Sequence, residues 1–171
     1  MILGMSLAAF TQLHVVLSLI GIAVGFVVLA GMFVSKKLEG WTALFLWTTV
    51  LTSVTGYFFP VDRILPSHIV GALSLAVLAV TIVALYGYRL KGASRWIYVT
   101  GAVLALYLNV FVGVVQAFLK IPVLSALAPT QESPVFILAQ GAVLLAFAVL
   151  GILAVRAFHP PEARPRAWSP A

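Results

Sequence analysis

The sequence predicts an all-α integral membrane protein, a bundle of five transmembrane helices, and three observations carry that prediction. Hydrophobic residues make up 63% of the 171-residue chain and charged residues only 8%, whereas soluble domains carry about 25% charged residues. The apolar residues gather in runs of about 20, which is the length needed to cross a hydrocarbon core of about 30 Å. The basic residues lie singly or in pairs between these runs. The net charge of +6 therefore indicates membrane topology and no nucleic-acid partner.

Five segments are expected to cross the lipid bilayer, and no soluble domain is left over. They are residues 7–34, 41–59, 66–88, 96–118 and 134–157. The second segment carries several threonines and a serine, whose hydroxyls can bond back to backbone carbonyls within the same helix. The first segment has no basic stretch before it and no small-residue cleavage site after a short apolar run, so we expect a retained helix and not a signal peptide.

The Lys and Arg residues orient the predicted bundle, because cytoplasmic loops carry an excess of them. One side receives only Arg63 and Lys120, whereas the other receives Lys36, Lys37, Arg89, Lys91, Arg95, Arg156, Arg164 and Arg166. We therefore expect the N-terminus outside and the C-terminus in the cytoplasm. Residues 1–158 form one transmembrane domain, and the Pro-rich tail 159–171 has nothing to bury and is expected to be a disordered cytoplasmic extension.

The connection formed by residues 119–133 differs from the other loops on the outer side. It contains Pro122, Pro129 and the apolar run VLSALA. This pattern predicts a short helix lying at the membrane interface. Such a helix is either a lid over the outer mouth of the bundle or a floor for lipid headgroups.

Two histidines are expected at one depth near the outer boundary of the hydrocarbon core. Helix rise places His14 about 33 Å from Lys36 and His68 about 32 Å from Arg89. One reading is that both imidazoles ligate a group held between the first and third helices, either a b-type haem or a transition metal. The other reading is that both cap helix ends or bond to headgroups.

Three carboxamides are the other candidate site residues. Asn109, Gly113 and Gln116 follow one another at i, i+4 and i+7, so they share one side of the fourth helix. Gln116 falls at the level of the histidines, and Asn109 and Gln140 fall deeper, at the level of Gly21. Unpaired amides at such depth cost several kcal/mol, about 2 to 7, so we expect them to face inward and bond to one another. They position a quinone, a polar substrate or a haem propionate, or they hold the helices together.

Several kinds of chemistry are excluded by residues that the chain lacks. It has no cysteine, which removes disulfides, thiolate zinc sites, iron–sulfur clusters and covalent c-type haem. No Asp, Glu or Lys lies inside a predicted span, and Arg156 lies only at the cytoplasmic end of the last one, so the usual marker of ion-coupled transport is missing. Asp62 and Glu132 lie in outer loops, where they either orient an imidazole or are solvated.

Four stretches, WTALFLWTTVLTSVTGYFFP, LPSHIVGALSL, YLNVFVGVVQAF and LAPTQESPVFILAQ, together resemble a family of short bacterial inner-membrane proteins with five helices. The resemblance implies a location in the bacterial inner membrane and carries no assigned activity. The paired histidines in a helical bundle are also loosely similar to small b-haem membrane proteins, but the ligand spacing of those proteins is absent.

Two functions follow from these observations. The first is an outer-face redox or ligand site in which His14 and His68 are axial or metal ligands and Asn109, Gln116 and Gln140 position the bound haem, metal or quinone. Its partner is a quinone or an electron carrier. The second is a non-catalytic accessory subunit or assembly factor of a larger membrane complex, in which the same polar layer only holds the bundle together.

Overall fold

The computed structural model describes residues 2–61 and 66–160, and over these ranges the protein is all-helical with no β-strand. The helices are α1 (Leu7–Phe33), α2 (Glu39–Thr55), α3 (Pro66–Ile82), α4 (Ser94–Lys120), α5 (Pro122–Leu127) and α6 (Pro134–Ala157). A 3₁₀ turn, η1 (Gly56–Phe58), extends α2, and a π-helical turn, η2 (Val83–Gly87), extends α3. Most of the predicted tail and Asp62 lie outside the described residues.

Local sequence explains where the helices begin. The Ser6 hydroxyl accepts a hydrogen bond from the Ala9 N–H (3.2 Å) at the start of α1, which satisfies one of the unpaired amides of the first turn. Pro122 and Pro134 open α5 and α6, where a missing N–H costs nothing. The short helix predicted within residues 119–133 is thus confirmed as α5, and its role as a lid or as a floor for lipid headgroups stays a prediction.

Four helices are long and apolar enough to cross a membrane: α1, α3 with η2, α4 and α6. The fifth predicted crossing falls on α2, which has 17 residues. Together with η1 it spans about 31 Å, from 1.5 Å per α-helical and 2.0 Å per 3₁₀ residue. The protein is therefore an all-α bundle compatible with a multi-pass membrane protein, and the fifth crossing stays a prediction.

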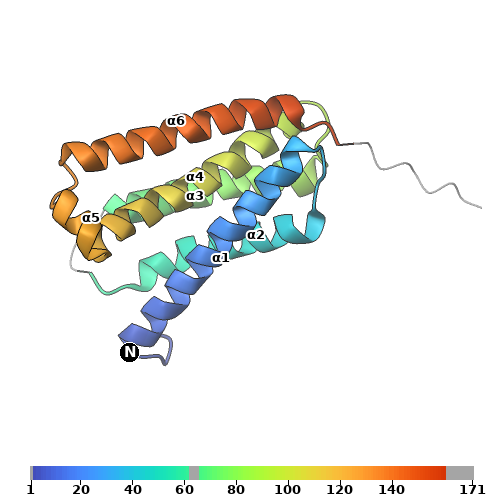
Figure 1. Cartoon of the computed structure of the whole chain (residues 1–171). Coiled ribbons are helices and arrows are strands. Elements are labelled where there is room, and N and C mark those ends of the chain that lie inside the picture. Colours follow the sequence, from blue (N-terminus) through green and yellow to red (C-terminus); the bar gives the residue numbers. More distant parts are fainter. Residues whose placement is uncertain (1, 62–65, 161–171) are drawn as a thin grey trace, which may run out of the picture.

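Helix α4 is the centre of the bundle (Figure 1). It packs against α1, α3 and α6, while α2 lies between α1 and α3. Its buried side chains include Tyr98, Val99, Ala102, Ala105 and Leu106, which are almost fully covered. Helices α1 and α3 are each packed on α2 and α4. These two helices therefore lie between α1 and α3.

The two ends of the bundle are packed differently. At the end that carries Lys36, Lys37, Arg89, Lys91, Arg95 and Arg156, called the basic end here, Phe158 is fully buried against Tyr98. Arg95 Nη1 donates to the carbonyls of Val155 (3.0 Å) and Phe158 (2.7 Å). The Ser35 hydroxyl donates to the Ala157 carbonyl (2.7 Å) and accepts from the His159 N–H (3.1 Å). These bonds tie the end of α6 to α4 and to the α1–α2 loop.

At the opposite end, α1 leaves the bundle. Figure 1 shows α1 crossing the other helices obliquely, with its first turns far from the start of α6. Leu13, Val16 and Leu19 are exposed along this part of α1, whereas Val24, Val28 and Met32 nearer the basic end are buried.

Glycines set how closely α1 approaches its neighbours. A Cβ at Gly25 would lie 2.5 Å from Leu106 Cδ1 and 2.9 Å from Phe45 Cε2. A Cβ at Gly21 would lie 3.3 Å from both the Asn109 amide nitrogen and the Thr48 hydroxyl. Both glycines therefore allow a close crossing of helices.

We predict that Gly25→Val lowers the free energy of unfolding in detergent by about 1–3 kcal/mol, because the larger side chain overpacks the crossing. Gly141→Val on α6 is the matched control, since nothing lies within 4 Å of a Cβ at that position. Equal stability of the two variants in a denaturant titration would contradict the close crossing.

Candidate functional site at the end of α2

His14 is fixed by a hydrogen bond that determines which of its ring nitrogens carries the proton. Its Nδ1 lies 2.8 Å from the Thr55 hydroxyl. That hydroxyl is placed to donate its one hydrogen to the carbonyl of Leu51 (2.7 Å) or Thr52 (3.1 Å), and with its hydrogen used there its oxygen accepts from the imidazole. A neutral His14 therefore carries its hydrogen on Nδ1, and Nε2 holds a lone pair.

Aromatic rings surround the imidazole. The Phe59 ring meets the His14 ring edge to face, with centroids 5.3 Å apart and an interplanar angle of 89°. Phe10, one turn earlier on α1, packs against the same Phe59 ring at 5.2 Å and is fully buried. His14 is half-buried, and its Nε2 has no hydrogen-bond partner among residues 2–61 and 66–160. The lone pair of Nε2 is therefore available to a ligand.

The last turn of α4 completes this site from the other side. Lys120 lies close enough to His14 for their charges to interact. Gln116 lies one turn before Lys120 and one turn after Gly113, where a Cβ would lie 3.4 Å from Ile22 on α1. Gln116 is exposed. We call His14, Thr55, Phe59 and Lys120 the His14 site.

His68 lies at the same end of the bundle but is held by a different residue of the α2–η1 segment. The Tyr57 hydroxyl donates to the His68 carbonyl (2.7 Å), and the two rings are 5.4 Å apart. The Tyr57 ring also packs on α3, where a Cβ at Gly71 would lie 3.2 Å from it. The two histidines thus approach the end of α2 from α1 and from α3.

Asn109 belongs to a deeper cluster. Its amide nitrogen donates to the Thr49 hydroxyl (3.1 Å) beside Gly21, so the predicted shared level of Asn109 and Gly21 is confirmed. Nearby on α2, the buried hydroxyl of Thr52 has no hydrogen-bond partner in the described part of the chain. These contacts hold α1, α2 and α4 together.

Gln140 faces the other side of α4. Its amide nitrogen donates to the Phe111 carbonyl (3.1 Å), while its buried carbonyl oxygen has no partner among the described residues. The expectation that the deep amides bond to one another is therefore wrong. Asn109 and Gln140 lie in different interfaces, because α4 separates α2 from α6.

The five predicted site residues accordingly fall in different places. His14 and Gln116 lie on facing helices at one end, His68 lies across the α2–η1 segment, and Asn109 and Gln140 serve two separate helix contacts. Their assignment as ligand-binding residues stays a prediction for each of them.

The chemical groups of the His14 site can be compared with what a metal ion, a haem and a lipid-soluble ligand each require. The described residues contain no group of three or more His, Cys, Asp or Glu side chains that could hold a metal ion, and the Lys120 charge disfavours a cation near His14. A haem iron would find one oriented imidazole, because ligating histidines donate their other N–H to a partner as His14 does. A lipid-soluble ligand with a hydroxyl group would find a hydrogen-bond acceptor in Nε2.

Thr55, Phe59 and Lys120 were not expected to belong to the site. Thr55 had a signal, since Thr48, Thr52 and Thr55 share one side of the second predicted helix. Lys120 also had one, because it lies four residues after Gln116 and so shares its side of the helix. Phe59 had none, since its ring position depends on the 3₁₀ turn.

No protein-family model matches the chain, and the comparisons with curated proteins and with solved structures found no match.

We predict that ¹⁵N NMR of histidine-labelled protein at pH 8 shows His14 protonated on Nδ1 and unprotonated on Nε2. Thr55→Val removes the acceptor and should shift the ring toward the Nε2–H tautomer, whereas Thr55→Ser should preserve the wild-type spectrum. An Nε2–H tautomer in the wild type would contradict the hydrogen-bond assignment.

Proposed function

We propose that the protein is a five-helix membrane protein whose His14 site binds a quinol or quinone from the bilayer. The observation that carries the proposal is the His14–Thr55 hydrogen bond, which leaves an oriented, half-buried lone pair on Nε2. A quinol has the hydroxyl donor that such an acceptor requires.

The neighbouring residues supply the other interactions of a quinone site. Phe59 offers an aromatic edge to the ligand ring, and aromatic pairs favour edge-to-face contacts. The Gln116 amide is an exposed donor and acceptor on the facing helix. The Lys120 ammonium would stabilise negative charge on a ligand oxygen. His14 Nε2 would accept a hydrogen bond from the quinol hydroxyl.

The proposed membrane topology has five crossings, with the His14 site on the outer side of a bacterial inner membrane. Support comes from the length of α2 with η1, from the excess of basic residues at one end, and from the sequence resemblance to short inner-membrane proteins. In this arrangement the ligand enters from the outer leaflet.

The proposal is tested by calorimetric titration of the detergent-purified protein with decylubiquinol under nitrogen. We expect saturable binding that His14→Ala weakens about fivefold, the value of one hydrogen bond of about 1 kcal/mol. His159→Ala is the matched control and should bind as the wild type does, because its exposed side chain lies at the opposite end.

Two results would overturn this function. The first is equal affinity of the wild type and His14→Ala for decylubiquinol. The second is a Soret band with a sharp α band on reduction after haem-supplemented expression, which would replace the quinol by a b-type haem on His14.

The topology is tested separately by single cysteines, since the natural chain has none. We expect Val61→Cys to react with an impermeant maleimide in intact cells and Lys91→Cys to react only after the membrane is opened. The reverse pattern would place the His14 site on the cytoplasmic side.

A further inference from the structure

The cavity of interest lies away from the His14 site, between α4 and α6. It has a volume of about 440 Å³ and is lined on α4 by Val103 and Tyr107 and on α6 by Phe147, Gly151 and Val155, with Arg156 at one end. Its lining is almost entirely apolar. Gly151 adds no side chain to this part of the groove wall, and a Cβ there would be in ordinary van der Waals contact with Val103 Cγ1 (3.5 Å).

The length of the groove matches one leaflet of a bilayer. On α6 its lining extends from Leu144 to Arg156, which is about 18 Å along a helix. Half of a hydrocarbon core of about 30 Å is about 15 Å. The groove therefore runs from the headgroup level at the basic end to the middle of the membrane, as an acyl chain does.

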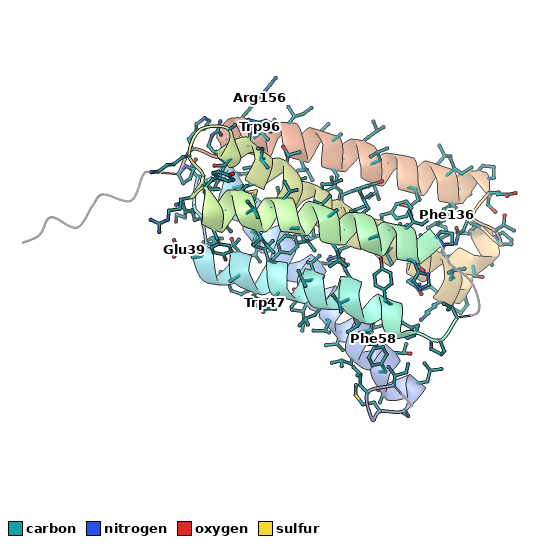
Figure 2. All side chains as sticks on the ribbon, turned by 180° about the vertical axis from the view of Figure 1, so that it is seen from behind. Glu39, Trp47, Phe58, Trp96, Phe136 and Arg156 are labelled. Carbon is teal, nitrogen blue, oxygen red and sulfur yellow. The ribbon has the colours of Figure 1, made fainter. Side chains whose placement is uncertain are left out.

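The charges at its open end favour an anion. Arg156 is exposed at the rim, and Arg95 binds the carbonyl of Val155, the residue before it. Figure 2 shows Trp96 and Arg156 at the same end of the molecule, and an exposed tryptophan is typical of the headgroup region. Neither described carboxylate, Glu39 or Glu132, lines the groove.

We propose that the α4–α6 groove binds one anionic phospholipid, with an acyl chain along Tyr107, Phe147 and Gly151 and the phosphate on Arg156. Guanidinium groups bind phosphate oxygens with two parallel hydrogen bonds. Basic pockets between transmembrane helices on the cytoplasmic side are suited to anionic headgroups. The site is independent of the quinol site, because it lies at the other end of α4.

The test is native mass spectrometry of the full chain in detergent with palmitoyl-oleoyl phosphatidylglycerol or the corresponding phosphatidylcholine added. We expect one phosphatidylglycerol to remain bound, at least tenfold more tightly than phosphatidylcholine. Arg156→Gln should weaken phosphatidylglycerol about tenfold, since hydrogen bonds to charged groups are among the strongest. Lys91→Gln, which removes an exposed charge of the same end outside the groove, should change it little.

A second pair of variants tests the acyl-chain position. Ala148→Trp fills the groove and should abolish retention of the lipid, whereas Ala146→Trp, exposed on α6 outside the lining, should retain it. Equal binding of both lipids, or unchanged binding in Arg156→Gln or Ala148→Trp, would overturn the proposal. The proposal would also be overturned if the bound molecule had the mass of a quinone. It would likewise be overturned if the spectrum showed a dimer of the chain that Ala148→Trp converts to monomer.

Discussion

The structure depends on the close approach of α1 and α2, which glycine and threonine make possible together. Gly21 and Gly25 leave no side chain between the helices, and the Thr48 and Thr55 hydroxyls satisfy themselves on carbonyls of their own helix. In a membrane no hydrophobic effect drives one apolar helix onto another, so close packing and internal hydrogen bonds must supply the stability. The same contact places Thr55 opposite His14, and the site at the end of α2 is therefore an extension of the helix crossing.

Much of the fold could be predicted from the composition and from the positions of the apolar runs. The apolar runs predicted α1, α3, α4 and α6 within a few residues, and the prolines around VLSALA predicted α5. The path of α1 was not readable, because helix rise gives the depth of a residue and not the tilt of its helix. Gln116 shares a side with Asn109, yet it lies exposed while Asn109 finds Thr49.

The sequence predicted the depth of the two histidines in the bundle, but it did not predict which residues contact them. Helix rise placed His14 and His68 at one end, and the structure agrees. Helix rise could not show that the end of α2 lies between α1 and α3. The pattern of apolar and polar residues along one helix does not identify the helices that pack beside it. The partners of His14 come from a threonine stripe and a 3₁₀ turn, and both read as ordinary helix from the sequence.

The bonds at the basic end have a consequence for how the protein is made. Ser35 and Ala157, which are joined by a hydrogen bond, are 122 residues apart in the chain. Arg95 donates to the carbonyls of Val155 and Phe158, which are also made much later than Arg95 itself. During synthesis from the N-terminus, α1, α3 and α4 are made before α6 exists. Until α6 arrives, the guanidinium of Arg95 and the hydroxyl of Ser35 lack these carbonyl partners, and the wall of α4 that receives Phe158 and Ala154 is open. Helix α6 therefore completes the bundle, and chains released before residue 157 would leave this face of α4 uncovered.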